Sequence, residues 1–283
     1  MKRRFGVSQF TTTPWSFEQD VESYARLGVD AIEVCEDKLD GERFAEQLAL
    51  IGDHDMEISS VQPAVRTLFP SRTQPEPKDV PGRLALYRRA IERIVPFAPG
   101  SPFVCNTGPP PDGNIQEVLD TAVKEYRGLA DFAAEHGARI ALEPLSPALM
   151  NVESAIWTLE QAMRVIAAVD QENFGVCVDT WNVWQTPDVV EAIEACGDRI
   201  FVVHVSDWRT PRSFADRHVI GEGDIPLPAL LRAIHRSGYR GAHTLEIFSE
   251  GVPDSLWERD LPTIITESRA ALDEAWRQAD EPG

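Results

Sequence analysis

Along the whole chain, short runs of apolar and β-branched residues alternate with longer segments in which apolar residues recur every three or four positions. Runs of the first kind predict strands of a sheet that is buried on both faces. Segments of the second kind predict amphipathic helices that cover such a sheet. The expected strands lie at residues 5–10, 30–35, 57–62, 102–106, 139–143, 174–179, 200–205 and 242–248.

Local signals mark where several of the helices begin and end. Ser16 and Gln19 have the spacing of a capping box, and Gly28 and Gly137 stand where C-cap glycines belong. The proline-rich stretch 63–81 is expected to be a long loop at the top of the fold. The expected helices lie at about residues 16–28, 41–51, 84–91, 114–136, 154–169, 187–196, 226–237 and 261–278.

Eight strand–helix units in regular alternation predict a parallel sheet, and eight of them predict its closure into a (β/α)8 TIM barrel. The competing fold, a doubly wound open sheet, usually carries a Gly-x-Gly-x-x-Gly turn after its first strand. The chain has neither that turn nor a Walker loop, and no Gly/Ser-rich linker divides its 283 residues. A single TIM-barrel domain is expected over 1–283, with the barrel at about 4–278.

Composition and charge narrow the range of partners. The 46 acidic residues against 27 basic ones give a net charge of −19, which disfavours nucleic-acid backbones and anionic membrane surfaces. The four cysteines form no Cys-x-x-Cys pair, so no disulfide framework is expected. Three of them lie inside apolar runs and are expected to be buried thiols. The sequence pattern shows no signal peptide and no membrane span, and a cytoplasmic location is expected.

Four polar side chains end successive apolar runs in the second half of the chain. They are Glu143, Asp179, His204 and Glu246. In a parallel barrel the C-terminal ends of the strands meet at one mouth, where active sites lie. Charged residues rarely end apolar runs unless they are paired or bind a metal, and this set of donors suits a hard or borderline divalent ion. The sequence therefore predicts a metal-dependent enzyme, although each residue alone could be an isolated polar group of the barrel rim.

The motifs around these residues resemble those of the xylose isomerase-like barrel superfamily, which includes sugar-phosphate isomerases, keto-sugar epimerases and inosose dehydratases. They are Leu-Glu-Pro-Leu, Val-Asp-Thr-Trp-Asn, His-Val-Ser-Asp, Asp-Arg-His-Val-Ile-Gly-Glu-Gly-Asp and Leu-Glu-Ile-Phe, and the resemblance spans nearly the whole chain. It implies one divalent ion, manganese before magnesium, cobalt or zinc, held by Glu143, Asp179, His204 and Glu246. It also implies that Glu143 and Glu246 exchange the substrate proton, as in the epimerases of the family.

Several loop residues are candidates for contact with a substrate. Arg217 precedes Gly221 by four residues, as the substrate-binding arginine does in epimerases of the family, and otherwise reads as a solvated loop arginine. His218 is expected to be a second base or an accessory metal ligand, or else a hydrogen-bonded loop histidine. Asp207 either orients an imidazole or caps the following turn. Glu33 either lines the mouth or is a simple strand-end carboxylate.

Tryptophans lie just after predicted strands, on the side of the mouth, at Trp15, Trp181, Trp184 and Trp208. Together they predict an apolar wall against a sugar-like ring, such as a glycoside or a ring-closed polyol, and the alternative is packing of the loops onto the barrel. Asn182 stands where many relatives carry the histidine of Asp-x-x-His. An amide can hydrogen-bond a substrate hydroxyl but cannot act as a base near neutral pH.

The expected reaction begins when a carboxylate or imidazole removes the proton next to a carbonyl that a divalent ion polarises. Returning the proton from an enediolate gives epimerisation or isomerisation of a keto-sugar or keto-polyol, which is the leading hypothesis. Elimination instead gives a dehydratase or lyase that acts on an inosose or a 3-keto glycoside. Small sugars, cyclitols or glycosides are the expected substrates. Relatives often form dimers or tetramers, so the further partners considered are a second copy of the chain, in a homo-oligomer, or a partner subunit.

Two other classes of function are considered. Apurinic endonucleases of the same superfamily need further histidines after early strands, and this chain offers Gln62 and Asn106 there. A binding subunit without enzymatic activity is the remaining alternative, and it predicts that a metal has no bearing on turnover.

Overall fold

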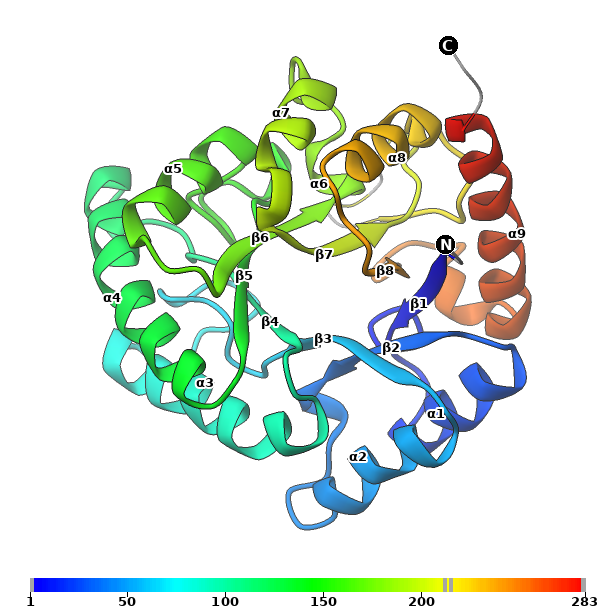
Figure 1. The fold of residues 1–283 in the computed structure, drawn as a ribbon, viewed down its shortest axis with the longest axis horizontal. Coiled ribbons are helices and arrows are strands. Elements are labelled where there is room, and N and C mark those ends of the chain that lie inside the picture. The colour runs from blue at the N-terminus through cyan, green and yellow to red at the C-terminus, as the bar shows by residue number, and fades with distance from the viewer. Residues whose placement is uncertain (1–2, 211–212, 214–215, 281–283) are drawn as a thin grey trace.

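Eight parallel strands close into a barrel in chain order, and helices surround it (Figure 1). The computed structural model describes residues 3–210, 213 and 216–280, so the outermost residues of the expected domain, 1–2 and 281–283, lie outside it. The strands are β1 (Arg4–Ser8), β2 (Ala31–Cys35), β3 (Glu57–Gln62), β4 (Pro102–Cys105), β5 (Arg139–Leu142), β6 (Phe174–Asp179), β7 (Ile200–Val205) and β8 (Ala242–Leu245). Pairing of β1 with β8 closes the sheet, which confirms the predicted TIM barrel.

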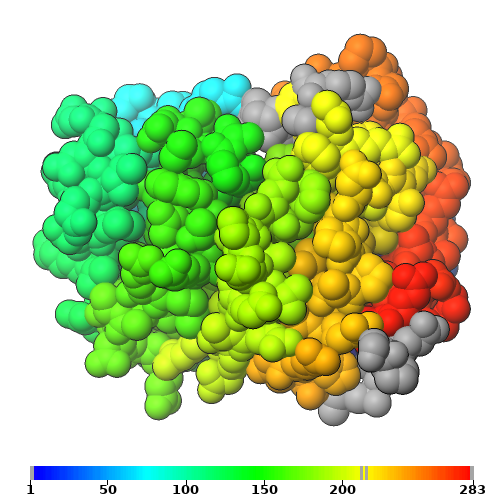
Figure 2. Space-filling model, turned by 90° about the horizontal axis from the view of Figure 1, so that it is seen from above, coloured from blue at the N-terminus to red at the C-terminus, as the bar shows by residue number. Residues whose placement is uncertain are grey.

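Helices cover the outside of the barrel between the strands (Figure 1). The helices are α1 (Phe17–Arg26), α2 (Phe44–Asp53), α3 (Val80–Ile94), α4 (Ile115–Glu135), α5 (Leu159–Val169), α6 (Thr180–Val183), α7 (Val189–Cys196), α8 (Leu227–Arg236) and α9 (Leu261–Asp280). Figure 2 shows α4, α5, α7, α8 and α9 side by side, with the loops after β3 and β8 at the same end of the molecule. None of the helices in the described part of the chain has the length and apolarity needed to cross a membrane.

The apolar strands are buried because one face packs under the helices and the other fills the barrel. Val104, Ala141, Cys177 and Val202 form a small cluster apart from the main core. Each stands two residues before a polar residue in or directly after its strand, and residues two apart on an extended chain share a face. These polar residues are Asn106, Glu143, Asp179 and His204. The interior of the barrel is therefore apolar in its middle layer and polar at the C-terminal mouth.

Some predicted boundaries were wrong, each for a local reason. β1 ends at Ser8 rather than residue 10, because a turn begins there, with Thr11 N donating to Ser8 O at 2.9 Å. β8 ends at Leu245 rather than residue 248. The helix expected from residue 154 begins at Leu159, because Thr158 forms the N-terminal capping box with Gln161. The capping box predicted at Ser16 is confirmed.

Candidate functional site

The four residues that the strand ends predicted as metal ligands come together at the mouth of the barrel. Glu143, Asp179, His204 and Glu246 are buried, and each offers one ligand atom within 4.8 Å of the others. His204 Nδ1 lies 3.6 Å from Glu143 Oε1 and 3.4 Å from Glu246 Oε2. Three buried carboxylates at this spacing repel one another unless cations compensate them. The oxygen-rich set with one imidazole therefore fits a divalent metal ion.

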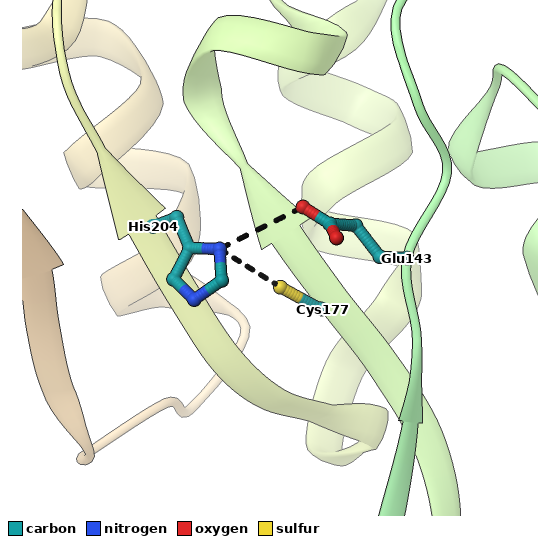
Figure 3. Close-up of side chains that lie close together, drawn as sticks. All are labelled: Glu143, Cys177 and His204. Atoms are coloured by element: carbon teal, nitrogen blue, oxygen red, sulfur yellow. Dashed lines mark hydrogen bonds and ion pairs between the residues drawn. The ribbon is translucent and has the colours of Figure 1, made fainter. Parts of the chain in front are cut away.

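Cys177 lies just below this cluster on β6. Figure 3 shows its sulfur and the Glu143 carboxylate both facing Nδ1 of His204, and the distance from Sγ to Nδ1 is 3.6 Å. Burial raises the pKa of the Cys177 thiol well above its ordinary value. A neutral thiol is a weak ligand for a hard ion. All four cysteines are buried and free, whereas the sequence predicted burial for three of them.

Arg217 reaches into the ligand cluster from the loop after β7. Its guanidinium lies 2.7 Å from Asp179 Oδ2 and 2.8 Å from Glu246 Oε2, and it is almost completely buried. The guanidinium also lies over the rings of Trp181 and Phe248, at 5.2 and 5.0 Å. Arg217 therefore holds a positive charge between two of the carboxylates, where it can also face a substrate.

Both the nitrogen and the oxygen of the Asn182 side-chain amide form hydrogen bonds with other protein groups. Its Nδ2 donates to Asp179 Oδ2 at 2.7 Å and to Glu143 Oε1 at 3.2 Å. Its Oδ1 accepts a hydrogen bond from the backbone N–H of Ser146 at 2.9 Å. The side chain thus holds two ligand carboxylates in place, although it also borders the cavity.

Glu33 on β2 contacts the far side of His204. His204 Nε2 donates to Glu33 Oε2 across 2.8 Å, and both side chains are fully buried. Burial alone would raise the pKa of Glu33, but the charge and hydrogen bond of His204 outweigh it and lower that pKa. The one sequence signal for this contact is an acidic residue in the middle of the apolar run 31–35.

Other predicted site residues lie away from the ligand cluster. Asp207 accepts hydrogen bonds from the backbone of Gly221, Gly223 and Ile225, at 2.9 to 3.1 Å, and so shapes the loop between β7 and α8. The backbone of His218 pairs with that of Asp207, and His218 does not border the cavity.

The tryptophans divide into two groups. Trp15 packs against Tyr24, with ring centroids 6.5 Å apart, and Trp208 packs against Trp184 at 5.1 Å. None of these three borders the cavity, whereas Trp181 and Trp257 do.

A cavity of about 980 Å³ opens above the cluster. Glu143, Glu246 and Arg217 border it, whereas Asp179 and His204 do not and are completely buried beneath. Aromatic rings of Phe10, Trp181, Phe248 and Trp257 form one part of its wall. The loop after β3, including Arg66, Thr73 and Gln74, forms another. The volume is at the upper end of what small-molecule sites have, so the cavity has room for a ligand larger than one sugar ring.

Burial is the largest influence on the pKa values of Glu246 and Asp179. It raises the pKa of Glu246 to about 8, with help from the charges of Glu143 and Glu33 and against those of His204 and Arg217. Burial likewise raises the pKa of Asp179, against the charge of Arg217. A carboxyl group that borders a cavity and has a pKa near neutrality is suited to accept and return a proton.

Comparisons with known proteins identify the family and the fold. The family model described as xylose isomerase-like TIM barrel matches residues 21–275. The inosose isomerase of Bacillus subtilis is 28% identical over 138 residues, which cover 47% of this chain and 48% of that protein. The 3-dehydroshikimate dehydratase of Pseudomonas aeruginosa is 31% identical over 136 residues, which cover 45% of this chain and 20% of that protein. The match thus spans about half the length of the first relative and less of the second.

The fold comparison covers the whole barrel. The crystal structure of the IOLI protein with a binding zinc atom is 19% identical, covers 99% of this chain and 100% of that one, and has a TM-score of 0.79.

Proposed function

Because the chain belongs to the xylose isomerase-like TIM barrel family, we propose that it is a divalent-metal-dependent enzyme that isomerises or epimerises a keto-sugar or keto-polyol. The observation that carries this proposal is the convergence of Glu143, Asp179, His204 and Glu246 beneath a large cavity. The similarity to an inosose isomerase supports it. The proposed substrate is a small sugar, cyclitol or glycoside and the proposed location is the cytoplasm.

A divalent ion held by these residues would polarise the substrate carbonyl and acidify the adjacent C–H bond. Glu143 and Glu246 border the cavity, so one can take the proton and the other can return it. Arg217 offers its guanidinium to the negative charge that develops on the substrate oxygens. Asn182 keeps Glu143 and Asp179 in a fixed geometry. Manganese is the proposed ion, with magnesium, cobalt and zinc as alternatives, and the zinc in the structural relative supports a divalent metal.

A metal-dependent dehydratase or lyase is the second candidate. The observation that favours it is that Asn182 is an amide whose hydrogen bonds go to protein groups. The residue at the position of the family's Asp-x-x-His histidine is here an amide engaged on both sides by protein groups. A proton taken by Glu143 or Glu246 would then leave with a β-leaving group instead of returning to carbon. The similarity to a dehydratase and the room for a glycoside in the cavity also support this reaction.

Proton exchange in heavy water tests both candidates. Manganese-loaded protein is incubated with a panel of ketoses, inososes and 3-keto glycosides, and the proton next to the carbonyl is followed by NMR. Deuterium in a recovered or epimerised sugar is the expected result. Loss of that proton together with a leaving group would establish the lyase. Bound Mn²⁺ with no exchange on any of these compounds would count against both and favour a binding subunit.

A further inference from the structure

Glu33 and His204 meet across the interior of the barrel. Glu33 belongs to β2 and His204 to β7, and β8 and β1 stand between these strands in the sheet. The hydrogen bond between them, 2.8 Å long, therefore crosses the barrel instead of running along it. It joins residues 171 positions apart, and each of the two side chains has no exposed surface.

The imidazole is fixed at both of its nitrogens. Nδ1 faces Glu143 and Glu246, at 3.6 and 3.4 Å, and so it is the nitrogen available to a metal ion. An ionised carboxylate can only accept a hydrogen bond, so Nε2 is the nitrogen that donates to Glu33, and Nδ1 is the nitrogen that faces the site of the metal ion. A carboxylate bonded to the outer nitrogen of a metal-binding histidine fixes the ring orientation and makes the ring a stronger donor.

Two features of the barrel hold Glu33 in this position. The hydroxyl of Ser60 on β3 donates to the same oxygen, Oε2, at 2.7 Å. The pairing of β2 with β3 shifts its register between Ile32 and Glu33, and irregularities of this kind re-aim side chains near active sites.

A structural role alone does not account for a carboxylate here. The other residues of β2 are apolar, and burying a carboxylate inside a barrel is unfavourable unless a partner compensates it. The partner that the structure provides is the candidate metal ligand itself. We propose that Glu33 is a positioning residue of the metal centre, which sets the orientation of His204 and thereby the affinity for the divalent ion. This inference rests on the proposed metal-dependent function.

The test is the affinity for Mn²⁺, measured from the electron paramagnetic resonance signal of the free ion, in wild type, Glu33→Gln and Glu33→Ala. We expect the dissociation constant to rise about 10- to 100-fold in Glu33→Ala. Glu33→Gln should fall between Glu33→Ala and wild type, because its amide oxygen can still accept the Nε2 proton. If Glu33→Ala does not fold, the Mn²⁺ affinity of Glu33→Gln tests the proposal by itself. This variant is expected to fold because glutamine has nearly the same shape as glutamate.

Asp20→Asn is the matched control. Asp20 in α1 is another fully buried carboxylate, but it binds Gln9, Thr12 and Lys38 instead of a candidate metal ligand. This control should bind Mn²⁺ as wild type does even if it is less stable. Both Glu33 variants binding Mn²⁺ like wild type would overturn the proposal.

The outcome also separates this inference from the proposed function. A wild type that binds Mn²⁺, with the expected loss in the Glu33 variants but no proton exchange on any compound, would leave the role of Glu33 standing and reject the proposed function. A wild type that binds no Mn²⁺ would reject both.

Discussion

Individual residues at the mouth of the barrel differ in what they can do. Glu143 and Glu246 border the cavity, whereas Asp179 and His204 lie beneath it. Of the four candidate ligands, only Glu143 and Glu246 are therefore placed where a substrate in the cavity could touch them. Arg217 adds a positive charge between Asp179 and Glu246. This division of the ligand set leads to two predictions at the scale of single residues.

Glu143→Gln and Glu246→Gln should each slow proton exchange by about 10²- to 10⁴-fold at saturating Mn²⁺, because glutamine cannot accept the substrate proton. The rate is measured by NMR in heavy water once a substrate of the panel is identified. Glu250→Gln is the control, because Glu250 borders the same cavity but is not part of the ligand cluster, and it should keep the wild-type rate. A variant that binds metal and keeps full turnover would remove that residue from the acid–base pair.

Arg217→Gln should destabilise the metal-free protein by about 3–5 kcal/mol, because it leaves buried carboxylates without their cation. The loss should shrink when Mn²⁺ is present, because the ion supplies positive charge to the same oxygens. Urea unfolding with EDTA or with Mn²⁺ measures both values. Arg236→Gln, which removes an exposed ion pair with Glu194, should have a small effect in either condition. Equal losses with and without Mn²⁺ would contradict this account of Arg217.

At the scale of elements, the loop after β3 shows how a helix builds part of the cavity. Arg83 in α3 is fully buried and donates to the backbone carbonyls of Thr67, Gln74 and Pro77, at 2.7 to 3.1 Å. Gln74 in turn donates to Ala64 O at 2.6 Å. One buried residue of α3 therefore anchors much of the proline-rich stretch that the sequence predicted as a loop.

Arg83→Met should loosen this loop, because it leaves buried carbonyl groups without donors, at about 1–3 kcal/mol for each group. Hydrogen exchange of residues 64–76 should become faster, and KM should rise while the affinity for Mn²⁺ stays constant. Arg89→Met, on the exposed face of the same helix, is the control. Unchanged exchange in this loop would show that Arg83 does not hold it.

The first residues of β8 carry a pH-sensitive group outside the metal centre. His243 lies edge-on to Tyr239 and Trp276, and burial, with lesser effects of the charges of Arg3 and His235, lowers its pKa to about 3. The unfolded chain binds this proton with a pKa of about 6.5. The stability that neutral His243 contributes is therefore complete above pH 6.5 and is lost as the pH falls from there toward 3.

Between pH 7 and pH 5 this effect amounts to about 2 kcal/mol of unfolding free energy. His243→Phe should reduce the pH dependence by that amount, measured by urea unfolding at both pH values. His54→Phe, at an exposed position after α2, should keep the wild-type dependence. A dependence in His243→Phe as steep as that of wild type would contradict the assignment.

At the scale of the whole molecule, the barrel brings together ligands from four consecutive strands. Glu143 follows β5, Asp179 ends β6, His204 lies in β7 and Glu246 follows β8. An ion bound to all four residues would link β5, β6, β7 and β8, which are half of the strands of the sheet. Since the unfolded chain does not hold these residues close, binding adds to the stability of the folded domain.

Mn²⁺ at 100 times its dissociation constant should raise the unfolding free energy by about 2.7 kcal/mol. Thermal or urea unfolding at increasing Mn²⁺ concentration measures the effect. Asp179→Ala is the control, because it removes a candidate ligand and leaves the acidic surface unchanged. The chain has a net charge of −19 and could also bind Mn²⁺ weakly on that surface, and this variant distinguishes such binding from binding at the site. An equal gain in this variant would mean that the ions bind elsewhere.

The sequence by itself determined the fold and the four candidate ligands. Strand and helix periodicity is local, and eight repeats of it leave few ways to bury every apolar face. The candidate ligands could be found because each ends an apolar run, and a parallel barrel brings all such ends to one mouth. They are Glu143, Asp179, His204 and Glu246.

Only the tertiary structure decided the contacts across the barrel and between loops. The bond between Glu33 and His204 depends on the register of strands far apart in the chain. The folding of loops over the mouth decides which of their residues reach the site. It places Arg217 and Asn182 against the carboxylates, and it places Trp181 but not Trp15 at the cavity. Such contacts are set by closure of the sheet and by packing between distant segments, and neither leaves a periodic signal in the local sequence.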